Sequence, residues 1–218
     1  MDCPDAKGWS MCLSHRSMGL VLALVALSPV AARSQSTVVI RIETDVGTIT
    51  AEIDTVRASI TATNFLRYVD MGMYSGGTFY RAVRLDNQPD DDVKIEVIQG
   101  GINRTRSDDQ LPPIRIEPTG ETGILHLDGV LSMARGGPDS ARGEFFICLG
   151  PQPELDQGGA RNPDGWGFAA FGRVIEGMNV VRLIQARETN GQSFPEGEQV
   201  LILGISRTGP TRQGRFQQ

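Results

Sequence analysis

Hydrophobic and polar residues alternate where a regular pattern first appears in the chain. In residues 37–44 an apolar residue stands at every second position from Val38 to Ile42. After a turn at Asp45–Gly47 the alternation resumes over residues 48–53. A period of two is typical of a half-buried strand, so the two runs predict an antiparallel hairpin.

The pattern changes to a helical period between Ser59 and Met71. Apolar residues there are spaced at i, i+3, i+4 and i+7, namely Ala62, Phe65, Leu66 and Val69. We expect Thr61 as the helix cap and Gly72 as its end. A second helix is predicted over residues 178–186, with the inward-facing residues Val180, Leu183 and Ile184.

The remaining apolar runs are short and are separated by turns rich in glycine, proline and aspartate. They predict strands at Thr78–Val83, Val93–Gln99, Val130–Ala134, Glu144–Leu149, Ala169–Val174 and Val200–Ile205. The fold class is therefore mainly β, with about eight strands and two helices. The pattern alone fits a closed barrel and a sandwich equally well.

The composition fits one domain behind a leader. The chain has 218 residues, 39% of them hydrophobic, and its 26 glycines and 12 prolines are spread between the apolar runs. This distribution is typical of a turn-rich β protein. The formal net charge is -5, and no cluster of lysine and arginine interleaved with aromatic residues occurs. Nucleic acid is therefore not an expected partner.

The N-terminal residues have the layout of an export signal. Lys7 and Arg16 precede an apolar stretch at Gly19–Leu27, and small residues follow up to two candidate cleavage points, after Ala32 or after Ser34. This layout predicts export, with the bacterial periplasm as the expected location. The apolar stretch is roughly nine residues long, against about 20 for a membrane-spanning helix, so no permanent membrane anchor is expected.

The expected organisation is a signal peptide at residues 1–34, one domain at residues 35–207 and a flexible tail at residues 208–218. The tail is set apart because it lacks apolar periodicity. The start site stays open, since a start at Met11 or Met18 also leaves a workable signal.

Several other chemistries lack the residues they need. Cys148 lies in an apolar run and is expected to be a small buried hydrophobe. His126, between two leucines, is expected to be structural, and no ligand cluster for zinc is present. The run Asp90–Asp92 lacks the ligand spacing of a calcium loop and is interpreted as a solvated turn, and residues 156–165 as a long turn without phosphate-binding character. We expect no metal and no cofactor.

Five short motifs follow one another in a fixed order along the chain: Phe79-Tyr80-Arg81, Gln99-Gly100-Gly101, Ser132-Met133-Ala134, Glu144-Phe145-Phe146-Ile147 and Phe171-Gly172-Arg173-Val174. In this order and register the chain resembles the cyclophilin family of peptidyl-prolyl isomerases, from about Val38 to Ile205. The resemblance implies a closed eight-stranded antiparallel barrel capped by two helices. It also implies a monomeric isomerase that acts on proline-containing polypeptides and needs no cofactor.

The resemblance also implies roles for individual residues. Arg81 matches the catalytic arginine of the family, Gln99 the glutamine that holds the substrate backbone, and Phe146 the floor of an apolar cup for the proline ring. The expected substrate-binding residues are Val97, Ala134, Arg135, Glu144, Leu155 and Phe168. A guanidinium suits the catalytic role because it stays charged and presents several donors in a rigid fork.

The chain departs from the usual family pattern at several positions. Between Arg81 and Gln99 lie 17 residues, which include an insertion at Asn87–Asp92 and so predict a longer loop beside the site. Further departures from common family residues are Glu96 beside Val97, Arg135 for asparagine, Glu144 for glutamine, Glu154 for tryptophan and Phe168 for histidine. Glu144 is expected to place a negative charge near Arg81, and Glu154 predicts weak inhibition by cyclosporin.

Two alternatives to the enzyme remain open on the sequence. The first is a non-catalytic peptide-binding or chaperone module that uses the same groove. The second is a carbohydrate-binding or surface-binding β domain, which predicts no proline-dependent binding. Exchange spectroscopy on a Xaa-Pro peptide separates these possibilities, because only the enzyme accelerates the exchange of the cis and trans forms.

Overall fold

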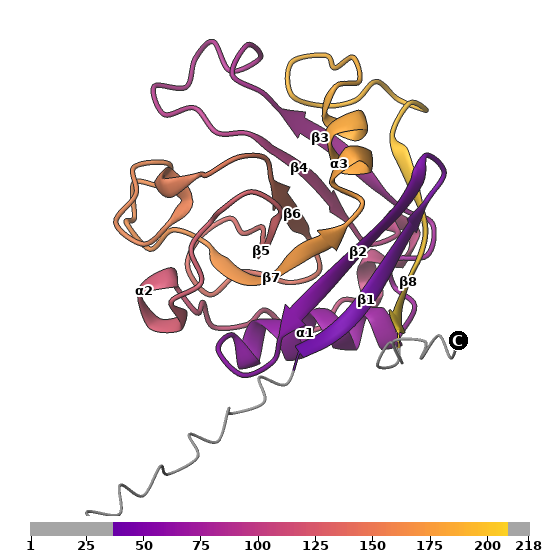
Figure 1. The fold of residues 1–218 in the computed structure, drawn as a ribbon, viewed down its shortest axis with the longest axis horizontal. Coiled ribbons are helices and arrows are strands. Elements are labelled where there is room, and N and C mark those ends of the chain that lie inside the picture. The colour runs from indigo at the N-terminus through magenta and orange to yellow at the C-terminus, as the bar shows by residue number, and fades with distance from the viewer. Residues whose placement is uncertain (1–36, 209–218) are drawn as a thin grey trace, which may run out of the picture. The chain divides into compact units, whose positions relative to one another are not determined.

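The computed structural model of the chain describes residues 37–208, which form a closed antiparallel barrel (Figure 1). The strands follow one another around the barrel in the order β1-β2-β7-β5-β6-β4-β3-β8. Their bounds are β1 Thr37–Thr44, β2 Gly47–Asp54, β3 Gly77–Val83, β4 Val97–Gly101, β5 Val130–Met133, β6 Phe145–Cys148, β7 Ala169–Glu176 and β8 Val200–Thr208. The barrel is confirmed over the sandwich, and closure leaves no open sheet edge.

Helices and turns complete the domain. The helices are α1 Ser59–Asp70, α2 Thr119–Thr122 and α3 Met178–Gln185, with 3-10 turns η1 Arg104–Asp109 and η2 Pro153–Leu155. Figure 1 shows α1 and α3 on opposite sides of the strands, and both helices bury apolar residues in the barrel core. The two long helices were predicted, whereas α2 and the 3-10 turns were not. Within residues 37–208 no helix has the length and apolar character needed to cross a membrane.

The start of α1 differs from the prediction. Thr61 is not the cap, because the N-cap position is Ala58, whose side chain makes no capping hydrogen bond. Instead, the carboxylate of Glu117 accepts hydrogen bonds from the backbone N–H of Ile60 (3.1 Å), the backbone N–H of Thr61 (2.7 Å) and the Thr61 hydroxyl. A residue distant in sequence therefore caps the helix. Gly72 follows the helix with a positive φ of 62°, as predicted.

The buried face of α3 also differs from the prediction. Leu183 was expected to face inward, but it is 54% exposed. Val181 is fully buried instead, together with Val180 and Ile184. The apolar set of this short helix is wider than one stripe, so the period alone did not decide which residues face the barrel.

The fourth strand begins later than expected. The strand predicted at residues 93–99 starts at Val97. Before it, the buried side chain of Gln88 donates to the carbonyl of Ile95 (2.8 Å) and accepts from its N–H (3.2 Å). A side-chain amide thus satisfies the backbone groups that a neighbouring strand would otherwise pair with.

The chain ends follow the predicted bounds only in part. Thr208, assigned to the tail, pairs with Val39 as the last residue of β8. The predicted signal peptide at residues 1–34 and residues 209–218 lie outside the described residues.

Two separate apolar clusters result from the alternation along the strands. On β6, Phe145 and Ile147 belong to the large cluster inside the barrel, whereas Phe146 and Cys148 belong to a second cluster on the outer face. The second cluster comprises Val83, Ile95, Val97, Phe146, Cys148 and Leu155, with Ala134 and Phe168 packed against it. Phe146 and Val97 are therefore not part of the barrel core.

Candidate active site

A β-bulge on β3 turns the arginine toward the outer face. Phe79 pairs with Gly100 and Arg81 pairs with Gln99, so Tyr80 is the extra residue between the two pairs. In regular alternation Arg81 would point to the same side as Phe79, which is fully buried in the barrel core. The bulge therefore brings the guanidinium to the same side of the sheet as the amide of Gln99.

The register of the neighbouring strands extends this outer face. Gln99 on β4 pairs with Phe146 on β6, and Phe146 pairs with Ser132 on β5. Directly paired residues share one side of a sheet. Arg81, Gln99 and Phe146 thus come from three adjacent strands and lie next to one another.

A cavity of about 230 Å³ opens on this face. Its lining residues are Arg81, Ile95, Val97, Gln99, Ala134, Arg135, Phe146, Leu155, Arg161, Asn162 and Phe168. The structure thus brings together all three predicted catalytic residues and five of the six predicted substrate-binding residues, the exception being Glu144. Sequence reasoning missed Ile95, Arg161 and Asn162. The last two lie in the predicted turn at residues 156–165, which carries no periodic pattern.

Aromatic rings form the apolar part of the cavity. Phe168 meets Phe146 edge to face, with ring centroids 5.3 Å apart and an interplanar angle of 88°. Behind Phe146 the ring of His126 lies nearly parallel at 6.0 Å. Such packing holds aromatic rings in fixed orientations. Phe146 therefore forms a rigid floor with Phe168 as one wall.

Arg135 lines the cavity, but its guanidinium is already engaged. It donates to both carboxylate oxygens of Asp164 (2.7 and 2.8 Å) and to the carbonyl of Gly167 (2.8 Å). It also lies over the ring of Phe168 at 5.2 Å. The side chain is only 2% exposed. Arg135 therefore fixes the wall of the cavity, and its charge is balanced by Asp164.

Arg81 is held by two amide oxygens. Its Nη1 donates to Oε1 of Gln99 (2.9 Å) and its Nε to Oε1 of Gln192 (3.1 Å), which also accepts from Nη2. Burial lowers the pKa of Arg81 from its usual value. The reference pKa of arginine is about 12 or higher, so the group remains a cation at neutral pH. The site therefore presents a fixed positive charge beside an apolar floor.

Glu144 does not lie where the sequence suggested. It was expected beside Arg81, yet Arg81 contacts the two glutamines and Glu144 does not line the cavity. Its carboxylate instead interacts with the Tyr80 hydroxyl, the backbone N–H of Ile102 and the charge of Arg104. The Tyr80 hydroxyl accepts a hydrogen bond from Nε2 of Gln99 (2.6 Å). Glu144 thus reaches the site only through Tyr80.

Burial raises the pKa values of both members of this pair. For Glu144 the cause is loss of solvation. Among the residues described, its Oε2 atom finds no hydrogen-bond partner. For Tyr80 burial comes first and the nearby Glu144 charge second. The same carboxylate fills the space that a Cβ at Gly101 would need, which accounts for a glycine at that position.

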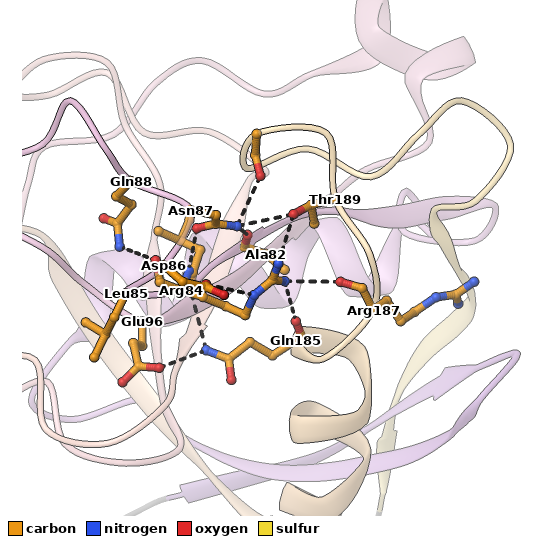
Figure 2. Close-up of polar contacts among 12 residues, drawn as sticks. Ala82, Arg84, Leu85, Asp86, Asn87, Gln88, Glu96, Gln185, Arg187 and Thr189 are labelled. Atoms are coloured by element: carbon orange, nitrogen blue, oxygen red, sulfur yellow. Dashed lines mark hydrogen bonds and ion pairs between the residues drawn. The ribbon is translucent and has the colours of Figure 1, made fainter.

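The two other glutamates that depart from the family pattern also stay outside the cavity. Glu96 lies near the side-chain amide of Gln185, as Figure 2 shows, and Ile95 lines the cavity in its place. Glu154 accepts a hydrogen bond from the backbone N–H of Ala160 (2.8 Å). Glu154 therefore holds the adjoining loop.

His126, Asp156 and Ser132 form a hydrogen-bonded row behind the floor. The Nδ1 atom of His126 lies 2.7 Å from Asp156 Oδ1, and its Nε2 atom 2.9 Å from the Ser132 hydroxyl. His126 is 1% exposed and Ser132 fully buried. No substrate reaches a hydroxyl in that position, so the row supports Phe146 and is not a nucleophilic triad. The structural role predicted for His126 is confirmed.

A larger hollow of about 300 Å³ lies elsewhere on the barrel. It is lined by Leu125 and Leu127, which are exposed, and by charged residues. Those charges are paired within the hollow, Arg57 with Asp54 and Arg173 with the partly exposed Glu52. It lacks an aromatic floor beside a cation. Within residues 37–208 no three histidine, cysteine or acidic side chains gather as a metal ion would require.

Known proteins are similar to this chain over most of its length. Residues 39–207 match the family model described as "Cyclophilin type peptidyl-prolyl cis-trans isomerase/CLD". The chain is 33% identical over 172 residues to peptidyl-prolyl cis-trans isomerase A of Dickeya dadantii, covering 78% of this chain and 82% of that protein. It is also 33% identical to the isomerase cyp18 of Streptomyces antibioticus, covering 69% of this chain and 84% of the relative.

A solved structure supports the fold independently. The cyclophilin-type isomerase of Cryptosporidium parvum, crystallised in the presence of the dipeptide Ala-Pro, superimposes with a TM-score of 0.62 at 20% identity. The match covers 78% of this chain and 99% of that one. The family model and the curated relatives support peptidyl-prolyl isomerase activity. The chain belongs to the cyclophilin family of peptidyl-prolyl cis-trans isomerases.

Proposed function

We propose that the chain accelerates rotation about Xaa-Pro bonds in the cavity of the outer face, with Arg81, Gln99 and Phe146 as its catalytic residues. The observation that carries the proposal is the position of a fixed guanidinium and an amide at the edge of an apolar hollow. Val97, Ala134, Leu155 and Phe168 complete the cup for the proline ring.

The chemistry needs no covalent step. Resonance gives the peptide C–N bond partial double-bond character and a rotation barrier of about 18–20 kcal/mol. In the twisted state the resonance is lost, and the prolyl nitrogen gains a lone pair that accepts a hydrogen bond. A guanidinium positioned there stabilises the twisted state more than either planar form. About 8 kcal/mol of such preference corresponds to a roughly million-fold acceleration.

Each part of the site has a separate task. Phe146 and its apolar neighbours hold the ring on one side of the bond, so that rotation moves the other side. Gln99 hydrogen-bonds the substrate backbone and Arg81 faces the prolyl nitrogen. Because Arg81 is already held by Gln99 and Gln192, little entropy is lost in ordering it when substrate binds.

The expected clients are exported polypeptides, whose folding the enzyme assists. Support for this part of the proposal comes from the signal-like layout of residues 1–34, which ends in small residues before Gln35. We infer a periplasmic monomer without a permanent membrane anchor. Expression of the full chain in a bacterium, followed by fractionation and N-terminal sequencing, tests this. A periplasmic product that begins at Arg33 or Gln35 supports it, and an uncleaved cytoplasmic product contradicts it.

Exchange spectroscopy on a Xaa-Pro tetrapeptide tests the catalytic proposal. Wild type is expected to accelerate cis-trans exchange, and Arg81→Ala to lose about 100-fold or more of kcat/KM, because it removes a charged donor used in the twisted state. Arg173→Ala is the matched control, since that exposed arginine pairs with Glu52 away from the cavity. A wild type that binds the peptide without accelerating exchange would establish the non-catalytic binding module instead.

A further inference from the structure

The connection between β3 and β4, which contains the insertion at Asn87–Asp92, is hydrogen-bonded to the chain that follows α3 (Figure 2). The guanidinium of Arg84 donates to the carbonyls of Gln185 (2.9 Å) and Arg187 (3.1 Å) and to the Thr189 hydroxyl (3.1 Å). Gln185 is the last residue of α3, whose terminal carbonyls have no partner inside the helix. Arg84 therefore caps α3 and ties the insertion to the next loop.

Asn87 makes the second attachment to this loop, and both ends of its side-chain amide are hydrogen-bonded. Its Nδ2 donates to the carbonyls of Ala82 (2.9 Å) and Gly191 (3.1 Å) and to the Thr189 hydroxyl (3.2 Å). Its Oδ1 accepts from the backbone N–H of Arg84 (2.8 Å). These bonds hold residues 189–191 beside the end of β3, so the insertion is not a freely solvated loop.

Asp91 then reaches from the insertion toward the active site. Its Oδ2 accepts hydrogen bonds from Nε2 of Gln192 (3.2 Å) and from Nη2 of Arg161 (3.2 Å). Arg161 lines the cavity and also donates to the carbonyl of Val93 (2.6 Å). The neighbours Asp90 and Asp92 are exposed. The prediction of a solvated acidic turn therefore fails for Asp91, because two groups on other loops bind its carboxylate.

The bond to Asp91 decides which end of the Gln192 amide faces Arg81. A carboxylate only accepts, so the nitrogen of Gln192 turns toward Asp91. The oxygen then turns toward Arg81, where it accepts from Nε and Nη2. A reversed amide would present N–H groups to a cation and lose both bonds. The carboxylate thus sets the orientation of the acceptor that holds the guanidinium.

We propose that Asp91 and Gln192 are positioning residues for Arg81, so that the insertion is a working part of the active site. The proposal rests on the proposed function, in which Arg81 acts on the twisted prolyl bond. A long arginine side chain adopts many rotamers, and holding it near one of them spares entropy that turnover would otherwise lose. Asp91 orients Arg81 through Gln192, and it also pairs with Arg161 at the cavity wall, whereas Gln192 does not line the cavity.

A double-mutant cycle with exchange spectroscopy tests the proposal. Gln192→Ala is expected to lower kcat about tenfold with KM unchanged within about twofold, because positioning affects the twisted state and not ring binding. Asp91→Ala is expected to lower kcat about fivefold. The double variant is expected to match Gln192→Ala alone. Asp92→Ala is the matched control, since this exposed carboxylate on the same loop is expected to leave kcat unchanged.

A spectroscopic signal from Arg81 gives an independent readout. The Nε–H group of Arg81 donates to Gln192, so its nitrogen-proton resonance is expected to be sharp and protected from solvent exchange in wild type. In Gln192→Ala and in Asp91→Ala the resonance is expected to shift and broaden, and in Asp92→Ala to stay in place. Melting temperatures of all variants show whether the fold is kept.

The outcomes separate this proposal from the proposed function. Additive losses in the double variant, an equal loss in Asp92→Ala, or a change confined to KM would overturn the positioning role. A wild type without turnover would contradict the proposed function. In that case the Arg81 resonance still tests the positioning role, because an unchanged signal in Asp91→Ala would refute the link through Gln192.

Discussion

Gln99 carries an amide whose two ends differ in hydrogen-bonding character, and its neighbours fix which end faces the arginine. Nε2 donates to the Tyr80 hydroxyl and Oε1 accepts from Arg81. The Tyr80 hydroxyl has one hydrogen to donate, and it donates this hydrogen bond to the carboxylate of Glu144. A chain of polar groups thus runs from Glu144 to the catalytic cation.

Replacement of Tyr80 by phenylalanine tests this chain at the residue scale. The change leaves Nε2 of Gln99 without its acceptor, so that only the bond from Arg81 to Oε1 still orients the amide. We expect kcat to fall about three- to tenfold, equivalent to one hydrogen bond of about 1 kcal/mol, while the fold is kept. Peptide exchange rates together with a melting curve check this. An unchanged kcat would show that Gln99 needs no help from Tyr80.

The raised pKa of Glu144 predicts a dependence of stability on pH. The folded state binds this proton more tightly than the unfolded chain, whose pKa lies near the ordinary 4.5. Folding stability due to Glu144 is therefore full below the unfolded pKa and is lost as pH rises through the folded pKa. Relative to wild type, Glu144→Gln is expected to gain stability over that window and then level off. Urea unfolding from pH 4 to pH 8 measures this, and curves that stay parallel would contradict it.

At the scale of elements, the alternation of side chains along β6 places one phenylalanine in the barrel core and the next one in the active site. Phe145 contacts the rings of Phe65, Tyr74 and Phe79 inside the barrel, whereas Phe146 lies in the outer cluster. The two adjacent phenylalanines therefore have different roles: Phe145 stabilises the barrel and Phe146 forms part of the site. The bulge at Tyr80 does the same for β3, since it places Arg81 outside after a core phenylalanine.

The two phenylalanines form a matched pair for a test. Phe145→Ala is expected to lower the free energy of unfolding by about 3–5 kcal/mol, because it leaves a cavity among packed rings. Phe146→Ala is expected to cost less stability, since its ring already borders an open cavity, and to lower kcat/KM strongly. Urea unfolding and exchange spectroscopy on both variants provide the comparison. Equal effects on both quantities would argue against two separate clusters.

Cys148 on the same strand offers a simple check of packing. The side chain is fully buried, and burial raises the pKa of its thiol well above the ordinary value. Thiol reagents attack the thiolate. A disulfide reagent at neutral pH is therefore expected to leave Cys148 unmodified in the folded protein and to modify it in urea. Rapid labelling under native conditions would show that the outer cluster opens.

Local pattern predicted the strands and both long helices, because alternation and helical spacing reflect which side of each element is buried. It did not predict the Glu117 cap of α1, the exposure of Leu183 or the bulge at Tyr80, since these depend on contacts distant in sequence. For the site, motif order placed eight of nine residues at the cavity. Gln192 was missed because it lies in a loop without periodicity and acts through its partners.

At the scale of the whole molecule, the barrel supplies a rigid outer face and the loops complete the site. The insertion, the turn that carries Arg161 and the loop that carries Gln192 meet at Asp91, and Gln192 connects them to Arg81. Figure 1 shows the β3–β4 connection and the segment between α3 and β8 close together at the upper edge of the barrel, and hydrogen bonds from Arg84 and Asn87 join them. In many enzymes a rigid scaffold positions loops that carry the functional residues.

An NMR titration with a Xaa-Pro tetrapeptide shows whether a proline-containing peptide binds on this outer face. We expect the largest shifts in the amides of residues 97–101, 134–135 and 146 and in the Nε–H group of Arg81. Shifts that instead gather around Leu125 and Leu127, which line the larger hollow, would contradict this expectation.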